Sequence, residues 1–317
     1  MDRMEIPTDP APNGYFSNPY EDLRDKTLAK LKEFCGDQDG WTIMSSTKAD
    51  IITSKKQIPG DPSSIPLVKG QGALKGITPY QFYSVVALPG ARQLWDDGFQ
   101  QGTTVRRYSR RTFKFYSIQK GAFLVQPRDF VGFQEAIIED DGTIYFFQAS
   151  VPEDENTGPV KGRTRATLTI SGWCIKPVHD GIDVTYVVKV NPNGSLPTAL
   201  VKIVVTELPD VVRTAFAWCK GAGLMCHIKE IAIQSVVRDE IYDHTQRELY
   251  RLMLIGKAGD EFDIAVDDKV RYKKGYTLTI KGEAQGDIEA TESRDNVHIK
   301  IGVAADGKKF ELVIQTV

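Results

Sequence analysis

The stretch KGRTRATLTISGWCIKPVHDGIDVTYVVKVN, residues 161–191, decides the fold class of this 317-residue chain. It holds two long runs rich in β-branched residues, near 161–177 and 182–191, with the turn His179-Asp180-Gly181 between them. Runs of this kind joined by a glycine-containing turn are typical of a β-hairpin. Because no helical pattern separates them, they predict two neighbouring strands of an antiparallel sheet.

More strands are expected on the N-terminal side of this hairpin. The alternating runs lie near 41–46, 49–56, 66–74, 103–108, 112–119, 129–139 and 143–151. Strands this long, with little helix between them, favour one curved antiparallel sheet.

Four helical segments interrupt or close the sheet. The first begins near residue 20 and ends at Gly36, and a short one spans 89–99. Thr78-Pro79 opens another, since Thr is a good N-cap and Pro fits the first helical position. The long apolar segment 197–220 predicts a helix with one buried stripe, kinked at Leu208-Pro209.

The chain divides into three parts by pattern. Residues 1–19 carry four prolines and no apolar period, which predicts a flexible or surface-draped tail. Residues 20–225 hold the curved sheet and its helices, and Gly221-Ala222-Gly223 marks the boundary. Residues 226–317 show only strand patterns, which favours a small β-sandwich or jelly-roll-like domain.

The composition excludes several classes of protein. With 40 Lys and Arg against 42 Asp and Glu, the chain is not a polycation, and no nucleic-acid partner is expected. No apolar run approaches the roughly 18 residues that span a bilayer, and we expect no secretory signal. Four scattered cysteines favour a reducing compartment, so a cytoplasmic location is expected.

No catalytic or metal-binding motif is apparent. The four histidines (His179, His227, His244 and His298) have no metal-ligand spacing, and no nucleotide-binding or nucleophile motif occurs. We therefore expect no catalytic residues, no metal and no cofactor. Arg106-Arg107 and Arg110-Arg111 have two interpretations, a patch for acidic headgroups or, as we favour, a solvated hairpin tip.

Five sequence blocks, in order and spacing, resemble a START (StAR-related lipid transfer) domain over roughly residues 20–223. The blocks are Pro127-Arg128-Asp129-Phe130-Val131, Lys161-Gly162-Arg163-Thr164-Arg165, Ser171-Gly172-Trp173-Cys174-Ile175-Lys176-Pro177, Val184-Thr185-Tyr186-Val187-Val188 and Asn191-Pro192-Asn193-Gly194-Ser195-Leu196-Pro197. The resemblance implies an α+β helix-grip fold, in which a curved antiparallel sheet wraps a long C-terminal helix around a hydrophobic tunnel. The β-rich residues 226–317 lie outside it.

The resemblance also implies a function, which is to hold one lipid (phospholipid, sterol or similar) and to exchange it with membranes. The sterol-handling branch places a buried acid, an Arg and a His where this chain has Phe115, Gln134 and Leu168. A sterol-specific site is therefore less favoured, and Gln134 remains to orient one polar group.

The expected ligand-binding residues are Phe115, Phe133, Gln134, Tyr145, Phe147, Leu168, Tyr186, Val188, Val212 and Phe216. The segment 121–126 falls where the family has a flexible loop beside the tunnel mouth. Its apolar residues Phe123, Leu124 and Val125 are expected to contact a membrane surface transiently, or to pack on the closing helix.

Two alternatives remain open. A hollow helix-grip enzyme would act on a hydrophobic substrate and would need an acid or histidine facing the tunnel. A scaffold would have a filled START-like core, and its β-domain would bind a protein partner.

Overall fold

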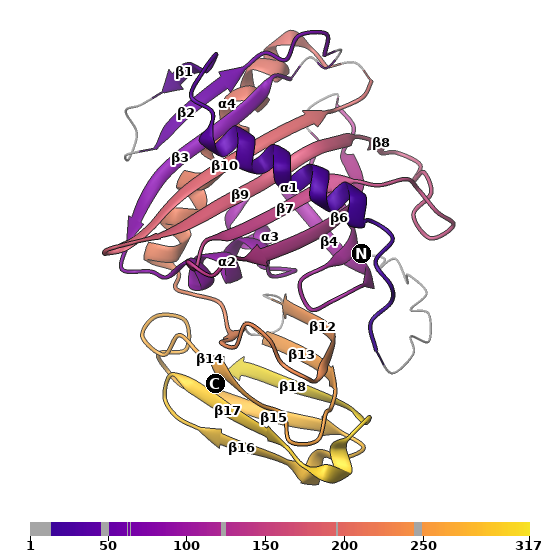
Figure 1. Ribbon diagram of the computed structural model, residues 1–317, viewed down its shortest axis with the longest axis vertical. Coiled ribbons are helices and arrows are strands. Elements are labelled where there is room, and N and C mark those ends of the chain that lie inside the picture. The colour runs from indigo at the N-terminus through magenta and orange to yellow at the C-terminus, as the bar shows by residue number, and fades with distance from the viewer. Residues whose placement is uncertain are drawn as a thin grey trace.

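The computed structural model has a large sheet with helices on both faces, followed by a smaller all-β unit (Figure 1). The structure describes residues 14–45, 51–61, 63, 65–121, 125–194, 196–243 and 249–317. The expected α+β class is confirmed, with a long helix closing the sheet and extra β-sheet regions after it.

Ten strands among the described residues form the large sheet, in the order β1-β2-β3-β10-β9-β7-β6-β5-β4, with β8 paired to β6. They are β1 (Thr42–Ser45), β2 (Ile52–Lys56), β3 (Leu67–Lys75), β4 (Phe99–Arg107), β5 (Phe113–Gln119), β6 (Arg128–Ile138), β7 (Ile144–Ser150), β8 (Thr164–Arg165), β9 (Thr167–Val178) and β10 (Gly181–Asn191). The pairs of the main path are antiparallel, including the predicted β9–β10 hairpin. The short β6–β8 pair is parallel.

The helices are α1 (Glu21–Gly36), α2 (Pro79–Ala87), α3 (Arg92–Trp95) and α4 (Thr198–Gly221). At the start of α2, the Gln81 backbone N–H donates to Thr78 Oγ1, and the Thr78 N–H donates to Gln81 Oε1. This reciprocal capping box, with Pro79 in the first turn, explains why the helix begins there. The predicted segment 89–99 is helical only over the four residues of α3.

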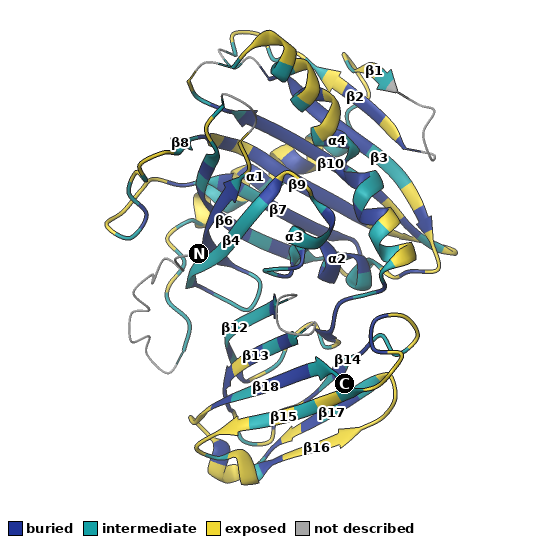
Figure 2. Cartoon of the chain, turned by 180° about the vertical axis from the view of Figure 1, so that it is seen from behind, coloured by how far each residue is buried: buried dark blue, intermediate teal, exposed yellow. Residues whose placement is uncertain are grey.

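Helices cover both faces of the sheet. On one face α1 packs against β7, β9 and β10, and its Leu31 is fully buried. On the other face α4 packs against β2, β3 and β10, beside α2 and α3 (Figure 2). Because strand residues alternate between faces, each buried strand carries apolar side chains on both sides.

α4 approaches the sheet closely at Gly70 of β3. A β-carbon added at Gly70 would overlap the carbonyl oxygen of Pro209, which lies inside α4. Glycine at this position therefore allows α4 to pack closer to the sheet than a residue with a β-carbon would. Proline cannot donate a backbone hydrogen bond, so α4 lacks one of its i→i−4 bonds at the same point.

The C-terminal unit consists of two sheets of four strands within the described parts of 227–317, in the orders β11-β14-β17-β16 and β12-β13-β18-β15. Its strands are β11 (His227–Ile228), β12 (Val236–Asp243), β13 (Leu249–Ile255), β14 (Glu261–Ala265), β15 (Tyr276–Gly282), β16 (Ile288–Glu292), β17 (Asn296–Ile301) and β18 (Lys309–Thr316). Short 3₁₀ turns lie at Gln285–Asp287 and Val303–Ala305. Buried side chains of both sheets join the core cluster of the α4 side.

Backbone contacts fasten this unit to the segment between α2 and α3. The Tyr242 N–H of β12 donates to the Pro89 carbonyl at 2.9 Å. Gly90, with φ +87°, lies so close that an added β-carbon would overlap the Tyr242 carbonyl oxygen. The N-terminal segment also reaches the unit, because the Val237 N–H donates to the Tyr15 hydroxyl at 2.9 Å. Of the predicted tail, residues 1–13 lie outside the described residues.

Candidate functional site

The main cavity lies between the α2–α3 segment and the strands β4 to β7 and β9. Its volume is ≈ 60 Å³. It is lined by Val86, Ala87, Leu88, Pro89, Gly90, Arg92, Trp95, Phe99, Gly102, Thr103, Thr104, Phe113, Phe115, Ser117, Gln134, Phe146, Gln148 and Trp173. Six of these residues are aromatic, so the walls suit an apolar ligand with few polar contacts.

Two hydrogen-bonded amides lie in the lining of this cavity. Gln148 Nε2 donates to Gln134 Oε1 at 2.7 Å, from neighbouring positions on β7 and β6. Thr104 Oγ1 is buried and has no hydrogen-bond partner among the described residues. These groups are neutral, so they can orient a hydroxyl, a carbonyl or an ester without a buried charge.

The one arginine of this lining, Arg92, is neutralised locally. It forms an ion pair with Asp96 at 2.7 Å, one turn further along, and lies 4.8 Å from the ring centre of Phe99. The pairing with Asp96 raises the pKa of Arg92 although burial opposes it. The main cavity is therefore apolar and close to electrically neutral.

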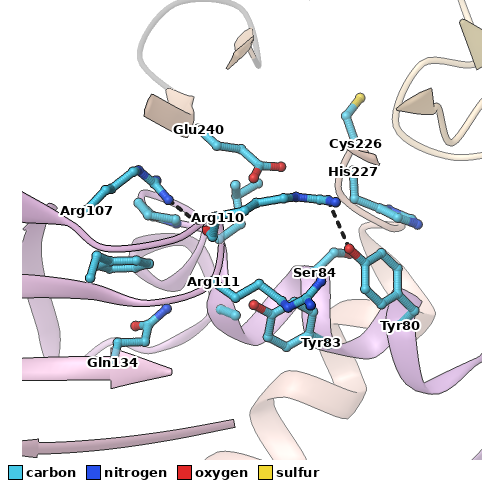
Figure 3. A pocket seen from close by; sticks show the side chains of 14 residues that line it. Tyr80, Tyr83, Ser84, Arg107, Arg110, Arg111, Gln134, Cys226, His227 and Glu240 are labelled. Atoms are coloured by element: carbon cyan, nitrogen blue, oxygen red, sulfur yellow. Dashed lines mark hydrogen bonds between the residues drawn. The ribbon is translucent and has the colours of Figure 1, made fainter. Parts of the chain in front are cut away.

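A second cavity, of ≈ 40 Å³, lies at the junction of the sheet and the C-terminal unit (Figure 3). It is lined by Tyr80, Tyr83, Ser84, Ala87, Leu88, Pro89, Arg107, Arg110, Arg111, Phe113, Gln134, Cys226, His227 and Glu240. Burial raises the pKa of Tyr83 and lowers that of His227. Both side chains are therefore neutral near pH 7.

The β4–β5 hairpin is not the solvated tip that we favoured. Arg110 donates to the Glu230 carbonyl at 2.7 Å, to the Ile228 carbonyl at 3.2 Å and to the Tyr80 hydroxyl at 2.9 Å. Arg111 donates to the Ile231 carbonyl. The arginines hold the C-terminal unit. Their partners in that unit are 118 to 120 residues away in sequence, so the local pattern does not indicate this role.

The predicted ligand-binding residues fall into three groups. Phe115 and Gln134 line the main cavity. Leu168, Tyr186, Val188, Val212 and Phe216 belong to the core cluster on the α4 side, but line neither cavity. Ligand contact by these seven residues stays a prediction.

The orientation predicted for Phe133, Tyr145 and Phe147 is wrong. All three are buried in the cluster beneath α1, on the opposite face from α4. The error concerns which residues of β7 point toward the cavity. Phe146 faces the cavity, and its neighbours Tyr145 and Phe147 do not. Because α1 buries the outer face of β7, apolar side chains occupy both faces of this strand. The alternation of polar and apolar residues therefore does not indicate which side chains face the cavity.

Sequence reasoning also missed several cavity residues, among them Trp95, Phe99, Phe146, Gln148 and Trp173. One signal could have found part of this set. Gln148 directly follows the run Ile144–Phe147 on β7, and it lies opposite Gln134 on β6. Placing both amides on one face puts Phe146 beside them and turns Tyr145 and Phe147 away.

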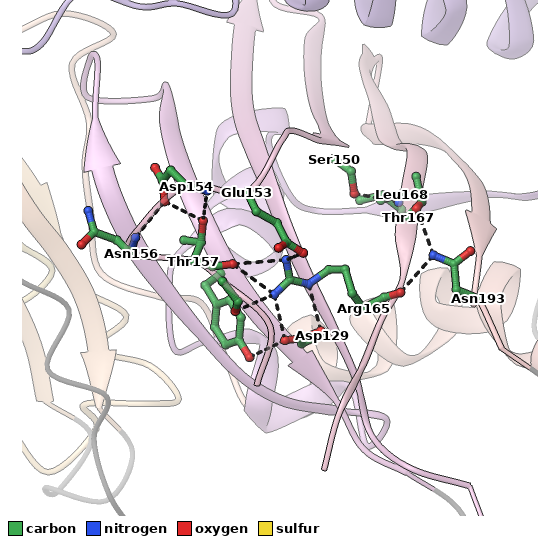
Figure 4. Close-up of polar contacts among 12 residues, drawn as sticks. Asp129, Ser150, Glu153, Asp154, Asn156, Thr157, Arg165, Thr167, Leu168 and Asn193 are labelled. Carbon is green, nitrogen blue, oxygen red and sulfur yellow. Dashed lines mark hydrogen bonds and ion pairs between the residues drawn. The ribbon is translucent and has the colours of Figure 1, made fainter. Parts of the chain in front are cut away.

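Three of the five sequence blocks meet in one polar network at the other end of the sheet (Figure 4). Asp129, 1% exposed, accepts from Arg165 Nε at 3.0 Å and Nη2 at 3.1 Å. The Tyr116 hydroxyl donates to Asp129 at 2.7 Å, and Arg163 donates to that hydroxyl at 2.7 Å. Arg165 thus forms a structural ion pair with Asp129.

The same network holds the loop before α4. Arg128 donates to the carbonyls of Pro192 and Asn193, and Asn193 Nδ2 donates to the Arg165 carbonyl at 3.0 Å. The motif residues therefore hold the chain at Pro192 and Asn193, before α4. Of the expected membrane-contact residues, Phe123 and Leu124 lie outside the described residues, and Val125 is half-buried.

Comparison with known families matches the START domain model to residues 21–223. This chain belongs to the START domain family. The match ends before β11, so the β-rich unit is an addition to the START domain.

Solved START structures share the fold of this domain. Human StAR-related lipid transfer protein 5 is 20% identical, with a TM-score of 0.55, over 62% of this chain and 92% of that one. Human STARD10 is 18% identical, with a TM-score of 0.55, over 62% of this chain and 79% of that one. No curated protein sequence matches the chain.

Two further features concern the described residues only. None of their helices combines the length and apolar character needed to cross a membrane. None of their His, Cys, Asp and Glu side chains forms a group of three or more suited to a metal ion.

Proposed function

We propose that this START domain protein binds one hydrophobic lipid between its sheet and helices and exchanges it with membranes, without covalent chemistry. The observation that carries this proposal is the aromatic cavity with the Gln134–Gln148 pair in its lining. Burying an apolar chain there gains about 0.8 kcal/mol per methylene, and a few polar groups would select the headgroup.

The cavity must enlarge to hold a whole lipid. Its ≈ 60 Å³ is well below the roughly 300–1,000 Å³ of small-molecule pockets. The N-terminal half of α4 is the element that we expect to move. Pro209 removes a hydrogen bond at its end, and Ile203 within it is 48% exposed, whereas the buried residues of α4 begin at Val205.

Native mass spectrometry of the purified full-length protein, followed by organic extraction, tests the proposal. We expect a co-purifying lipid at one molecule per chain. The contrary result is a protein that carries no lipid and takes none from liposomes.

The small cavity also favours the alternative of a filled core. In that case the START domain is a scaffold, and the β-rich unit binds a protein partner. The same experiment separates the two functions, because a scaffold gives the mass of the bare chain even after incubation with liposomes.

Membrane contact through residues 123–125 is a separate prediction. Changing Phe123, Leu124 and Val125 together to Ser removes apolar side chains that would enter the interface, so lipid transfer between liposomes should slow about tenfold or more. Val178→Ser with Val303→Ser is the matched control, since both are exposed elsewhere. Equal transfer rates in the triple variant and the control would refute the role of the segment.

A further inference from the structure

We propose that the junction cavity binds the acidic group of an amphiphilic ligand whose apolar part lies in the main cavity. The inference rests on the proposed function and names the ligand class. It assigns a role to the β-rich unit as well, because Cys226, His227 and Glu240 of that unit form one wall of the junction cavity.

The two cavities adjoin along one line of residues. Ala87, Leu88, Pro89, Phe113 and Gln134 line both of them. Their charges differ: the main cavity has one arginine, which is paired with Asp96, whereas three arginines line the junction cavity. A ligand that spans both would therefore be apolar at one end and charged at the other.

The environment of Arg107 most clearly indicates that an anion binds here. It is 7% exposed, its Nη1 donates to the Arg110 carbonyl at 2.9 Å, and its guanidinium lies 4.9 Å from the Phe113 ring centre. Its Nε is buried without a hydrogen-bond partner among the described residues. A buried cation with an unused donor is costly unless an anion accompanies it.

The neighbouring charges leave the cavity positive. Arg110 and Arg111 donate to neutral oxygens, and neither forms an ion pair with a described carboxylate. Glu240 is the one carboxylate of the lining, and it accepts a hydrogen bond from the Tyr250 hydroxyl at 2.8 Å. Three guanidinium groups therefore face one carboxylate, beside a neutral His227.

The size of the junction cavity limits what can enter it. A volume of ≈ 40 Å³ has room for a group of a few atoms, such as a carboxylate or a phosphate, and not for an acyl chain. Arginine suits both groups, because its planar donors match their oxygens. The ligand is thus an acidic lipid-like molecule whose chain extends past Phe113 and Gln134 into the main cavity.

Titration calorimetry on the full-length protein, after removal of any bound lipid, tests this inference with matched probes. Octanoate and 1-octanol share a chain and differ in charge, and inorganic phosphate has charge without a chain. We expect octanoate to bind at least tenfold more tightly than 1-octanol, about 1.4 kcal/mol, and phosphate alone to bind more weakly than octanoate.

Variants assign the preference to the junction. R107Q should lose the preference for octanoate and keep the affinity for 1-octanol, whereas R107K should retain most of the preference. R106Q is the charge-matched control, because Arg106 lines neither cavity. E240Q should tighten octanoate several-fold, a gain that no unfolded variant would show.

The contrary results are distinct. Equal affinity for octanoate and 1-octanol overturns the inference and leaves the proposed function standing. Phosphate that binds as tightly as octanoate overturns the link between the two cavities. Unchanged preference in a folded R107Q overturns the assignment to Arg107. If neither chain-bearing probe binds, the proposed function fails first, and the inference with it.

Discussion

At the scale of single residues, Asp129 shows how the START motif acts through geometry. Its carboxylate is buried, accepts two hydrogen bonds from Arg165, and accepts a third from the Tyr116 hydroxyl. A buried ion pair gains little net stability, because desolvation offsets much of the Coulombic attraction. Its effect here is to fix β8 beside β6.

Breaking this pair should be costly. Asp129→Asn removes the buried charge partner of Arg165 and leaves only the more exposed Glu153, so the free energy of unfolding should fall by about 3 kcal/mol. Asp25→Asn is the control, because Asp25 pairs with Arg24 at an exposed site where ion pairs contribute at most about 1 kcal/mol. Urea unfolding measures both variants. A loss in Asp129→Asn no greater than in the control would contradict a structural role for the pair.

Gln134 is the second residue that merits a test, because it lies where the two cavities meet. Gln134→Leu should change the class of co-purifying lipid seen by mass spectrometry and cost about 1–3 kcal/mol, since Gln148 then loses its partner. The double change of Gln134 and Gln148 to Leu should recover stability without recovering the lipid profile. An unaltered profile in both variants would exclude a role for the amide in recognition.

At the scale of elements, much of the fold follows from the sequence. The hairpins, the helix start at Thr78-Pro79 and the closing helix all come from local patterns, and the structure has each of them. The local patterns do not indicate which elements cover each face of the sheet. Once α1 covers the outer face, Tyr145, Phe146 and Phe147 are all buried, and only the partner strand decides which of them meets the cavity.

The packing of α4 against β3 gives a prediction at this scale. Gly70→Ala places a methyl group against the Pro209 carbonyl, so either α4 moves outward or stability falls by about 1–3 kcal/mol or more. Gly158→Ala is the control, because an added β-carbon there meets no atom within 4 Å. Urea unfolding and lipid uptake report on the two effects. Unfolding and uptake equal to those of the control would show that α4 is not seated through Gly70.

At the scale of the whole molecule, the junction could not be predicted from either half alone. Its contacts join residues more than a hundred positions apart, such as Arg110 with Ile228 and Glu230. The link after α4 is held as well: Arg271 donates to the Ala222 and Leu224 carbonyls, and the Leu224 N–H donates to Asp267. The β-rich unit is therefore anchored at several points around the cavity that it helps to form.

This anchoring predicts that the two parts unfold together, and Gly90 offers a way to separate them. Gly90→Ala introduces a strained positive φ and a methyl group that overlaps the Tyr242 carbonyl oxygen, which should break the hydrogen bond between Tyr242 and Pro89. Gly76→Ala carries the same kind of backbone strain, at φ +72°, but meets no atom within 4 Å.

Scanning calorimetry compares the three proteins. We expect one cooperative transition in the wild type and in Gly76→Ala, and two resolved transitions in Gly90→Ala, because the parts then unfold independently. Octanoate should also bind Gly90→Ala more weakly than Gly76→Ala, since the wall that holds Glu240 and His227 is displaced. A single transition in Gly90→Ala, at the temperature of Gly76→Ala, would mean that the β-rich unit is not coupled to the START domain through this contact.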